Sequence, residues 1–171
     1  MEHMLKTTTD SQTRVYLLSE YLNQFRNTLF VQTMFAEFEL IIHNMEERSE
    51  PLTIESLSKV YHDLSVKYWG SEMITDEQNN LGWAKTPHFY RAFYVYQYAT
   101  GYSVAIALTK RLQSGDFQAL EDYLGFLKAG SSDYPINILK KAGIDMKTPL
   151  PVCEALQVFE GLISEMEEYY N

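Results

Sequence analysis

The sequence predicts an all-α fold, an elongated array of several helices, and three observations carry this prediction. The first 50 residues contain neither glycine nor proline. Apolar residues recur at steps of three and four along most of the chain, as on one face of a helix. No segment keeps the alternation of apolar and polar residues that a half-buried strand shows. With 171 residues, the chain is expected to be a single all-α region spanning residues 1–171.

The first predicted helix is also the longest and runs from about Ser11 to Glu47. Val15 and Leu18 begin an apolar stripe that continues at helical spacing as far as Leu40. At ~1.5 Å per residue such a helix is roughly 50 Å long, which is unusual in a chain of this size. Helices of this length usually run beside a larger body or form one wall of a cleft.

The second predicted helix begins after Thr53, a residue type that caps helix N-termini, and ends at Gly70. Residues 49–51 include a proline and separate it from the first helix. Residues 71–81 are rich in polar side chains and are predicted to form a loop.

Four further helices are predicted, each from a capping residue or a proline near the start, and the first three also from a glycine at or near the end. They cover approximately residues 88–112, 116–130, 135–143 and 149–169.

Residues 88–102 form the most aromatic segment, in which seven of fifteen side chains are Phe or Tyr. On a helix these side chains occupy two sides. One side carries Tyr90, Tyr94, Tyr98 and Tyr102, and the other carries Phe89, Phe93 and Tyr96. Packing in a helical core is the commoner use of such a stripe. The alternative is that the phenols and His88 face a pocket, where their O–H and N–H groups donate hydrogen bonds to a developing oxyanion or to an extended peptide.

The charge of the chain excludes several function classes. The formal net charge is -9, from 14 Lys and Arg against 23 Asp and Glu. Nucleic acids and anionic membranes bind basic patches, so neither is an expected partner. The chain has no apolar run of the ~18 residues that a membrane span needs and no recognisable secretory signal, and we expect it in the cytoplasm. One cysteine, Cys153, excludes an internal disulfide.

The histidines do not have the spacing of a zinc site. A zinc-binding helix commonly carries two histidines four residues apart, whereas the closest pair here, His43 and His62, is 19 residues apart. Two carboxylates, Glu37 and Glu39, lie among apolar residues of the long helix and could serve acid–base chemistry. The preferred interpretation is that one of them is exposed and the other pairs with a Lys or Arg elsewhere.

Several segments closely resemble the oligoendopeptidase F family, which is related to thimet oligopeptidase. These segments are residues 21–30, 32–39, 87–101, 126–131 and 141–146. The resemblance extends over nearly the whole chain.

The resemblance implies a largely helical zinc metalloendopeptidase that cuts short peptides in a deep channel. In this family the zinc ligands are two histidines of a His-Glu-x-x-His helix and a glutamate on a following helix, and the motif glutamate is the general base. The present chain has no His-Glu-x-x-His and resembles the C-terminal helical part. The resemblance therefore implies zinc in the parent enzyme but none bound to this chain.

The implied partners are an oligopeptide substrate and the missing N-terminal catalytic part. We expect the chain alone to be inactive, and we expect it to self-associate through the face on which the missing part docks. The alternative from another class is a free-standing helical peptide-binding or scaffold domain without catalysis. Phenols that open onto a groove favour the peptidase, and phenols fully buried in a self-contained core favour the scaffold.

The resemblance also gives candidate site residues. In the family a histidine and tyrosines from this part reach the active site and stabilise the tetrahedral intermediate, and the matching residues are His88, Tyr90, Tyr94 and Tyr96. Their spacing cannot place all four on one face of a helix, so we expect two or three of them to point at the reaction centre.

Overall fold

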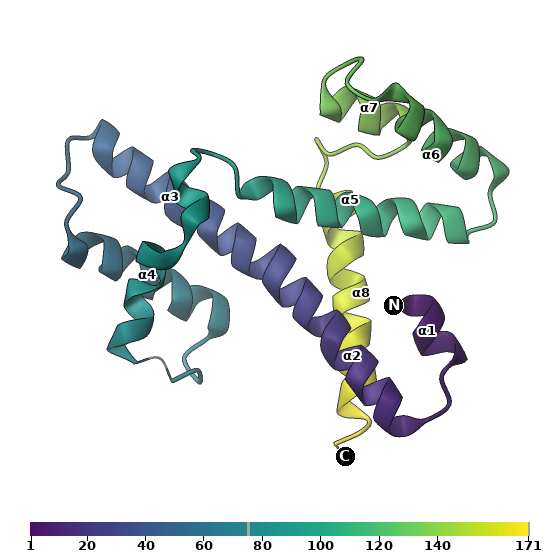
Figure 1. Cartoon of the computed structure of the whole chain (residues 1–171), viewed down its shortest axis with the longest axis horizontal. Helices are drawn as coiled ribbons and strands as arrows, with labels where there is room; N and C mark the ends of the chain where they lie inside the picture. The colour runs from purple at the N-terminus through teal and green to yellow at the C-terminus, as the bar shows by residue number, and fades with distance from the viewer. Residues whose placement is uncertain (75, 171) are drawn as a thin grey trace. The chain divides into compact units, whose positions relative to one another are not determined.

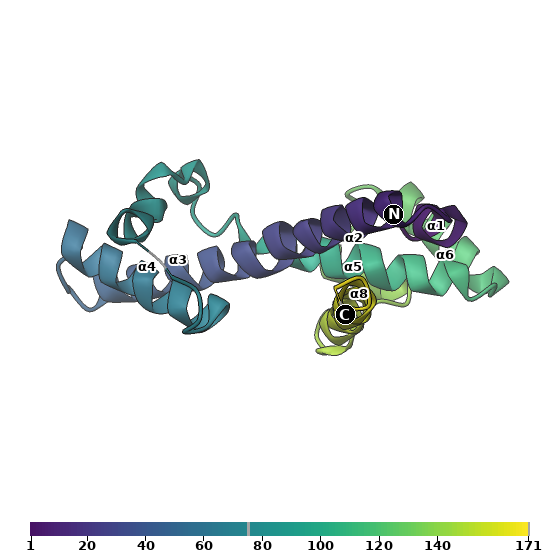
Figure 2. The same cartoon turned by 90° about the horizontal axis from the view of Figure 1, so that it is seen from below.

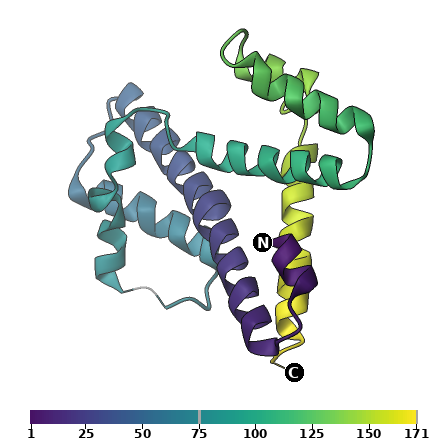
Figure 3. The same cartoon turned by 45° about the vertical axis from the view of Figure 1, so that its right-hand side comes forward.

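Helices are the only regular elements in the described part of the computed structural model, residues 1–74 and 76–170, which confirms the all-α prediction. The ribbon is shown from three sides in Figures 1, 2 and 3. The chain forms two compact units: unit 1 consists of Met1–Arg26 and the chain from Thr100 onward, and unit 2 is Asn27–Ala99. The expectation of one region over residues 1–171 stays a prediction. No helix in the described residues is both long and apolar enough to cross a membrane.

The helical run predicted between Ser11 and Glu47 is continuous, and it contains a π turn that the sequence pattern does not predict. The run consists of α2 (Ser11–Phe25), a π-helical turn (Arg26–Phe30) and α3 (Val31–Glu47). A π turn accommodates one residue more than an α-helical turn, and such turns are frequent at functional sites. The boundary between the two units falls at this turn.

Unit 1 contains both ends of the described chain. Its helices are α1 (Glu2–Thr7), α2, most of α5 (Tyr96–Gln113), α6 (Phe117–Ala129), α7 (Pro135–Lys141) and α8 (Leu150–Glu167). The last three agree with the predicted helices, and the Asp116 carboxylate caps α6 as expected. The sequence does not predict α1, because its 6 residues are too few to show a periodicity.

Aromatic rings from three helices meet in the core of unit 1. Phe25 on α2 is fully buried. Its ring meets Tyr102 of α5 edge-on at 5.0 Å and contacts Phe159 of α8 at 5.4 Å. The Tyr102 hydroxyl is buried there without a hydrogen-bond partner among the described residues.

A second cluster of unit 1 joins α5, α6 and α7. Val104 and Leu108 of α5 pack with Ile144, which follows α7. Arg111 of α5 donates to the Ala142 carbonyl and forms an ion pair with Asp122 of α6 at 3.0 Å. Since one guanidinium satisfies groups on two other segments, it fixes how these helices meet.

Gly143 ends the segment after α7 under two constraints. Its φ is +80°, in the left-handed region that favours glycine. A Cβ at this position would lie 2.0 Å from the Arg111 guanidinium. No other residue type fits there without displacing the Arg111 side chain.

Unit 2 is built on the pairing of α3 with α4 (Ile54–Trp69) and on two 3₁₀ helices, η2 (Glu77–Lys85) and η3 (Pro87–Tyr90). The predicted limits of α4 are confirmed. Thr53 and Ser56 form a reciprocal capping box at its start, and Gly70 with φ +79° ends it. The core of unit 2 contains the buried residues Met34, Phe38 and Leu64.

Two predictions for unit 2 are wrong. The second half of the predicted loop 71–81 is helical, because the Asp76 carboxylate caps η2 by accepting a hydrogen bond from the Asn79 amide at 2.9 Å. Thr75 lies outside the described residues. The helix predicted from residue 88 begins only at Tyr96, after η3 and a non-helical segment 91–95. Phe93 in that segment has φ +54°, a conformation that ends any helix.

Gly143→Ala is expected to destabilise the protein by about 2 kcal/mol, from the left-handed backbone and the displacement of Arg111. Gly125→Ala is the matched control. Gly125 lies inside α6 with open space around its Cβ position, so alanine there is expected to stabilise the protein by about 0.5–1 kcal/mol. Urea midpoints of the three proteins measure both effects, and equal midpoints would contradict the account of Gly143.

Tyr102→Phe is expected to stabilise the protein by about 1 kcal/mol near neutral pH, because it removes a buried hydroxyl that lacks a partner. Burial raises the pKa of Tyr102 from 10.0 to about 12. The unfolded chain therefore loses this proton first, and the stability contributed by this group is complete below pH 10 and is lost as the pH rises toward 12. Between pH 10 and 12 the variant should lose less stability than the parent protein, as measured by thermal unfolding.

Candidate functional site

Three aromatic side chains of unit 2, His88, Tyr94 and Tyr98, form what we call the His–Tyr cluster. The His88 and Tyr94 rings are stacked with centroids 6.0 Å apart. Tyr98 meets both rings edge-on, at 5.6 Å from His88 and 5.4 Å from Tyr94. The hydroxyl oxygens of Tyr94 and Tyr98 are 2.8 Å apart and share a hydrogen bond. One imidazole and two phenols thus contact one another.

The break in the predicted helix brings this cluster together. On a continuous helix, residues six apart such as His88 and Tyr94 point in widely different directions. The non-helical segment 91–95 changes the direction of the chain between them, so the rings of His88 and Tyr94 can stack. The aromatic stripe expected on one helix is therefore replaced by a cluster with contributions from η3, the segment and α5.

Two apolar neighbours, one partly buried and one fully buried, hold the backbone beside the cluster residues. Phe89, directly after the cluster histidine, packs against Phe35 at 5.4 Å and Phe38 at 5.1 Å, both on α3. Val95, directly after the first cluster tyrosine, is fully buried. His88 and Tyr94 are thus each followed directly by a residue that packs into the core.

The hydrogen-bonded pair of Tyr94 and Tyr98 can donate one further hydrogen bond. Its hydrogen bond with Tyr94 raises the pKa of Tyr98, and burial acts in the same direction, whereas the charge of Arg91 acts weakly against them. The Arg91 guanidinium lies 4.8 Å from the centre of the Tyr94 ring. One hydroxyl of the pair donates to the other, so the accepting hydroxyl keeps its own proton for a third group. Such a donor can stabilise a developing negative charge.

The imidazole of His88 contains an unpaired atom. Its Nδ1 is buried and has no hydrogen-bond partner among the described residues. Leaving a buried polar group unpaired costs about 1–3 kcal/mol. Since native proteins pair most such groups, the free nitrogen marks His88 as a candidate for binding a further group.

Two of the four predicted site residues, His88 and Tyr94, belong to the cluster. Tyr90 and Tyr96 are 90% and 51% exposed. Tyr98 completes the cluster, and the sequence reasoning did not select it. A signal was present, because Tyr98 follows Tyr94 by four residues, the spacing at which neighbouring helical side chains meet.

The expected arrangement of the two carboxylates is confirmed for Glu37 and wrong for Glu39. Glu37 pairs with Lys67 at 2.5 Å, which lowers the pKa of Glu37. Glu39 is not at the surface, because its side chain is directed into the core and finds a backbone donor there. It is 2% exposed, and its Oε1 accepts a hydrogen bond from the Phe93 amide at 2.8 Å.

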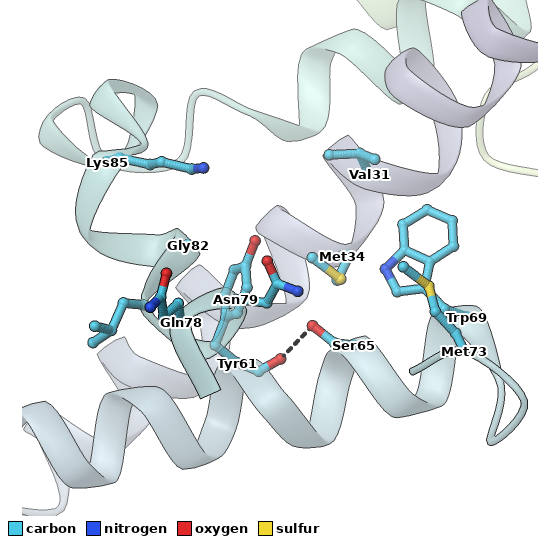
Figure 4. Close-up of a pocket in the computed structure, with 11 residues that line it drawn as sticks. Val31, Met34, Tyr61, Ser65, Trp69, Met73, Gln78, Asn79, Gly82 and Lys85 are labelled. Atoms are coloured by element: carbon cyan, nitrogen blue, oxygen red, sulfur yellow. Dashed lines mark hydrogen bonds between the residues drawn. The ribbon is translucent and has the colours of Figure 1, made fainter. Parts of the chain in front are cut away.

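Unit 2 also has a pocket of about 370 Å³ (Figure 4). Its wall includes Met34, Trp69 and Met73, with Lys85 at its edge. Figure 4 shows the hydrogen bond that the Ser65 hydroxyl donates to the Tyr61 carbonyl at 2.9 Å. None of the predicted site residues lines this pocket, so it is separate from the His–Tyr cluster.

The described residues do not form a metal site. In residues 1–74 and 76–170, no three His, Cys, Asp or Glu side chains lie close enough together to hold a metal ion. His43 contacts the Phe93 ring at 4.7 Å, and His62 shares a hydrogen bond with Asn80 at 3.0 Å. The described residues therefore offer no ligand set for the zinc that the resemblance implies in the parent enzyme.

The chain belongs to Peptidase family M3, whose family model matches residues 1–158. A chain whose described part is all-helical and contains the His–Tyr cluster is thereby placed in a peptidase family.

Individual relatives agree with this assignment. The chain is 50% identical over 167 residues to Oligopeptidase PepF of Bacillus subtilis, covering 98% of this chain and 25% of the relative. It is 40% identical to the chromosomal oligoendopeptidase F of Lactococcus lactis subsp. cremoris, covering 98% of this chain and 28% of the relative. The crystal structure of oligoendopeptidase-F from Enterococcus faecium matches with a TM-score of 0.94 and 44% identity, over 98% of this chain and 32% of that one. The chain thus spans between a quarter and a third of these proteins.

Proposed function

We propose that this chain is the C-terminal part of a zinc metalloendopeptidase that hydrolyses oligopeptides, and that the chain alone is inactive. The match of residues 1–158 to Peptidase family M3 carries the proposal. The relatives named oligopeptidase and oligoendopeptidase F support the substrate class. Because the sequence contains no His-Glu-x-x-His, the zinc and the general base are assigned to the rest of the enzyme.

The His–Tyr cluster supplies hydrogen-bond donors to the reaction in this proposal. The free hydroxyl proton of the Tyr94–Tyr98 pair and an N–H of His88 stabilise the oxyanion that develops as the peptide bond is attacked. The unpaired Nδ1 of His88 supports this role, because it leaves the imidazole able to take up a further contact. Tyr90 and Tyr96 remain proposed substrate-binding residues, and both are exposed.

Two features of the chain support the remaining parts of the proposal. The formal net charge of -9 disfavours nucleic acid and anionic membranes as partners. Cys153 is a free, exposed thiol, which fits a reducing compartment such as the cytoplasm.

We further infer that the rest of the peptidase packs against the outer face of α6. Four exposed apolar side chains lie on this face at helical spacing, namely Phe117, Leu120, Leu124 and Leu127. On the inner side of α6, Tyr123 and Phe126 pack into the core of unit 1. A helix that is apolar on two sides is typical of burial between two layers.

Peptidase activity in the full context tests the proposed function. This chain would replace the corresponding segment of the Enterococcus faecium oligoendopeptidase-F, and cleavage of quenched oligopeptides would be measured. We expect an active chimera, with kcat reduced about 10²–10³-fold by Tyr98→Phe, the loss typical of removing one oxyanion donor. His88→Ala is expected to cause a loss of similar size.

Tyr134→Phe is the control, because it removes a phenol oxygen from a residue that is 80% exposed in unit 1, and it should leave kcat unchanged. The isolated chain with added zinc should show no cleavage. Chelator-sensitive cleavage by the isolated chain, or full activity of Tyr98→Phe and His88→Ala in the chimera, would contradict the proposal.

The isolated chain is expected to self-associate through the α6 face, with a mass that rises with concentration in sedimentation velocity. Leu124→Asp should remove this dependence by placing a charge in the middle of the apolar face. Gln157→Glu adds the same negative charge on α8 and should leave the association unchanged. A monomer at all concentrations, or equal effects of both variants, would exclude the α6 face as the contact.

A further inference from the structure

Glu39 is a buried acid that the proposed peptidase reaction does not use. Its side chain is 2% exposed, and no Lys, Arg or His among the described residues lies within ion-pair distance of it. Burying a carboxylate without a cation is costly unless strong hydrogen bonds compensate. The hydrogen bond that accounts for its position is the one from the Phe93 amide, at 2.8 Å.

The partner of Glu39 is a backbone group in an unfavourable conformation. Phe93 has φ +54°, and a non-glycine residue in the left-handed region costs of the order of 1 kcal/mol or more. Such a conformation persists only when surrounding contacts impose it. The Glu39 side-chain oxygen that accepts the hydrogen bond from the Phe93 amide is one such contact.

A second residue of α3 holds the side chain of Phe93. The His43 ring lies 4.7 Å from the Phe93 ring. Glu39 and His43 are four residues apart on α3 and therefore share one face of the helix. This face of α3 contacts Phe93 twice: Glu39 bonds to its backbone amide, and His43 contacts its ring.

Phe93 is followed directly by a member of the His–Tyr cluster. Tyr94 stacks on His88 and bonds to Tyr98. A change of backbone conformation at Phe93 would redirect the next side chain and break both contacts. The position of the cluster therefore depends on the conformation that Glu39 stabilises.

We propose that Glu39 is a positioning residue, whose buried carboxylate holds Phe93 in its left-handed conformation and thereby places Tyr94 against His88 and Tyr98. It acts through the backbone and does not contact substrate. The consequence for catalysis rests on the proposed function, whereas the consequence for the geometry of the cluster does not.

The geometry is tested in the full chain by NMR. In Glu39→Ala we expect the Phe93 amide to exchange with solvent about tenfold faster or more, as for the loss of one strong hydrogen bond. The pKa of Tyr98, measured with ¹³C-labelled tyrosine, should fall toward its ordinary value because Tyr94 no longer bonds to it. Glu39→Gln keeps an acceptor oxygen, so its Phe93 exchange rate and its Tyr98 pKa should both stay close to those of the parent protein.

Glu37→Ala is the matched control, since it removes a carboxylate two residues away that pairs with Lys67, and it should change neither readout. If Glu39→Ala does not fold, Glu39→Asp gives the same test, because it keeps a carboxyl group but withdraws it from Phe93. Parent-like exchange of the Phe93 amide and an unchanged pKa of Tyr98 in Glu39→Ala and Glu39→Asp would overturn the proposal.

Kinetics of the chimera test the catalytic consequence. Glu39→Ala should lower kcat at least about tenfold with little change in KM, and Glu39→Gln should recover most of the loss. An unchanged kcat despite altered NMR readouts would overturn the positioning role in catalysis. An inactive parental chimera would count against the proposed function, while the NMR experiment would still decide whether Glu39 positions the cluster.

Discussion

The hydrogen bond between the Glu39 carboxylate and the Phe93 amide is the constraint on which the candidate site depends. It stabilises a left-handed residue in the middle of a segment whose composition suits a helix. Because a left-handed residue cannot continue a helix, the chain is divided there into η3 and α5. This division lets residues 88 and 94 face each other, and no continuous helix would allow that contact.

The same constraint explains which features the sequence could predict. The limits of α4 and α6 follow from local signals, namely the capping box of Thr53 with Ser56, the positive φ of Gly70 and the Asp116 cap. These signals act between residues close in sequence and can be read without knowing the fold. The break at Phe93 depends instead on an acceptor 54 positions earlier in the chain, and the pattern of residues 88–102 contains nothing that marks it. The resemblance located two members of the cluster, His88 and Tyr94, but the helical interpretation of their geometry was wrong for this reason.

Unpaired buried atoms have different meanings in the two units. The Tyr102 hydroxyl lies beside Phe25 in an aromatic core, and the raised pKa of Tyr102 comes from burial alone. Its ring meets the apolar Phe25 ring edge-on, and we interpret Tyr102 as a packing residue whose oxygen is tolerated. The Nδ1 of His88 is also unpaired, but its ring lies against two phenols that are hydrogen-bonded to each other. An unsatisfied atom therefore indicates a site only where its neighbours could act with it on a common ligand.

The outer face of α6 bears on whether the chain is a free-standing domain. A self-contained scaffold would be expected to turn a polar face outward, since large exposed apolar patches favour association. The core of unit 1 is already filled by residues such as Val104, Leu108 and Ile144, so Phe117 and Leu127 are not needed to complete it. Four large apolar side chains at helical spacing are more readily explained by a second layer of protein than by the folding of this chain. This face therefore favours the proposed packing against the rest of a peptidase over the scaffold alternative.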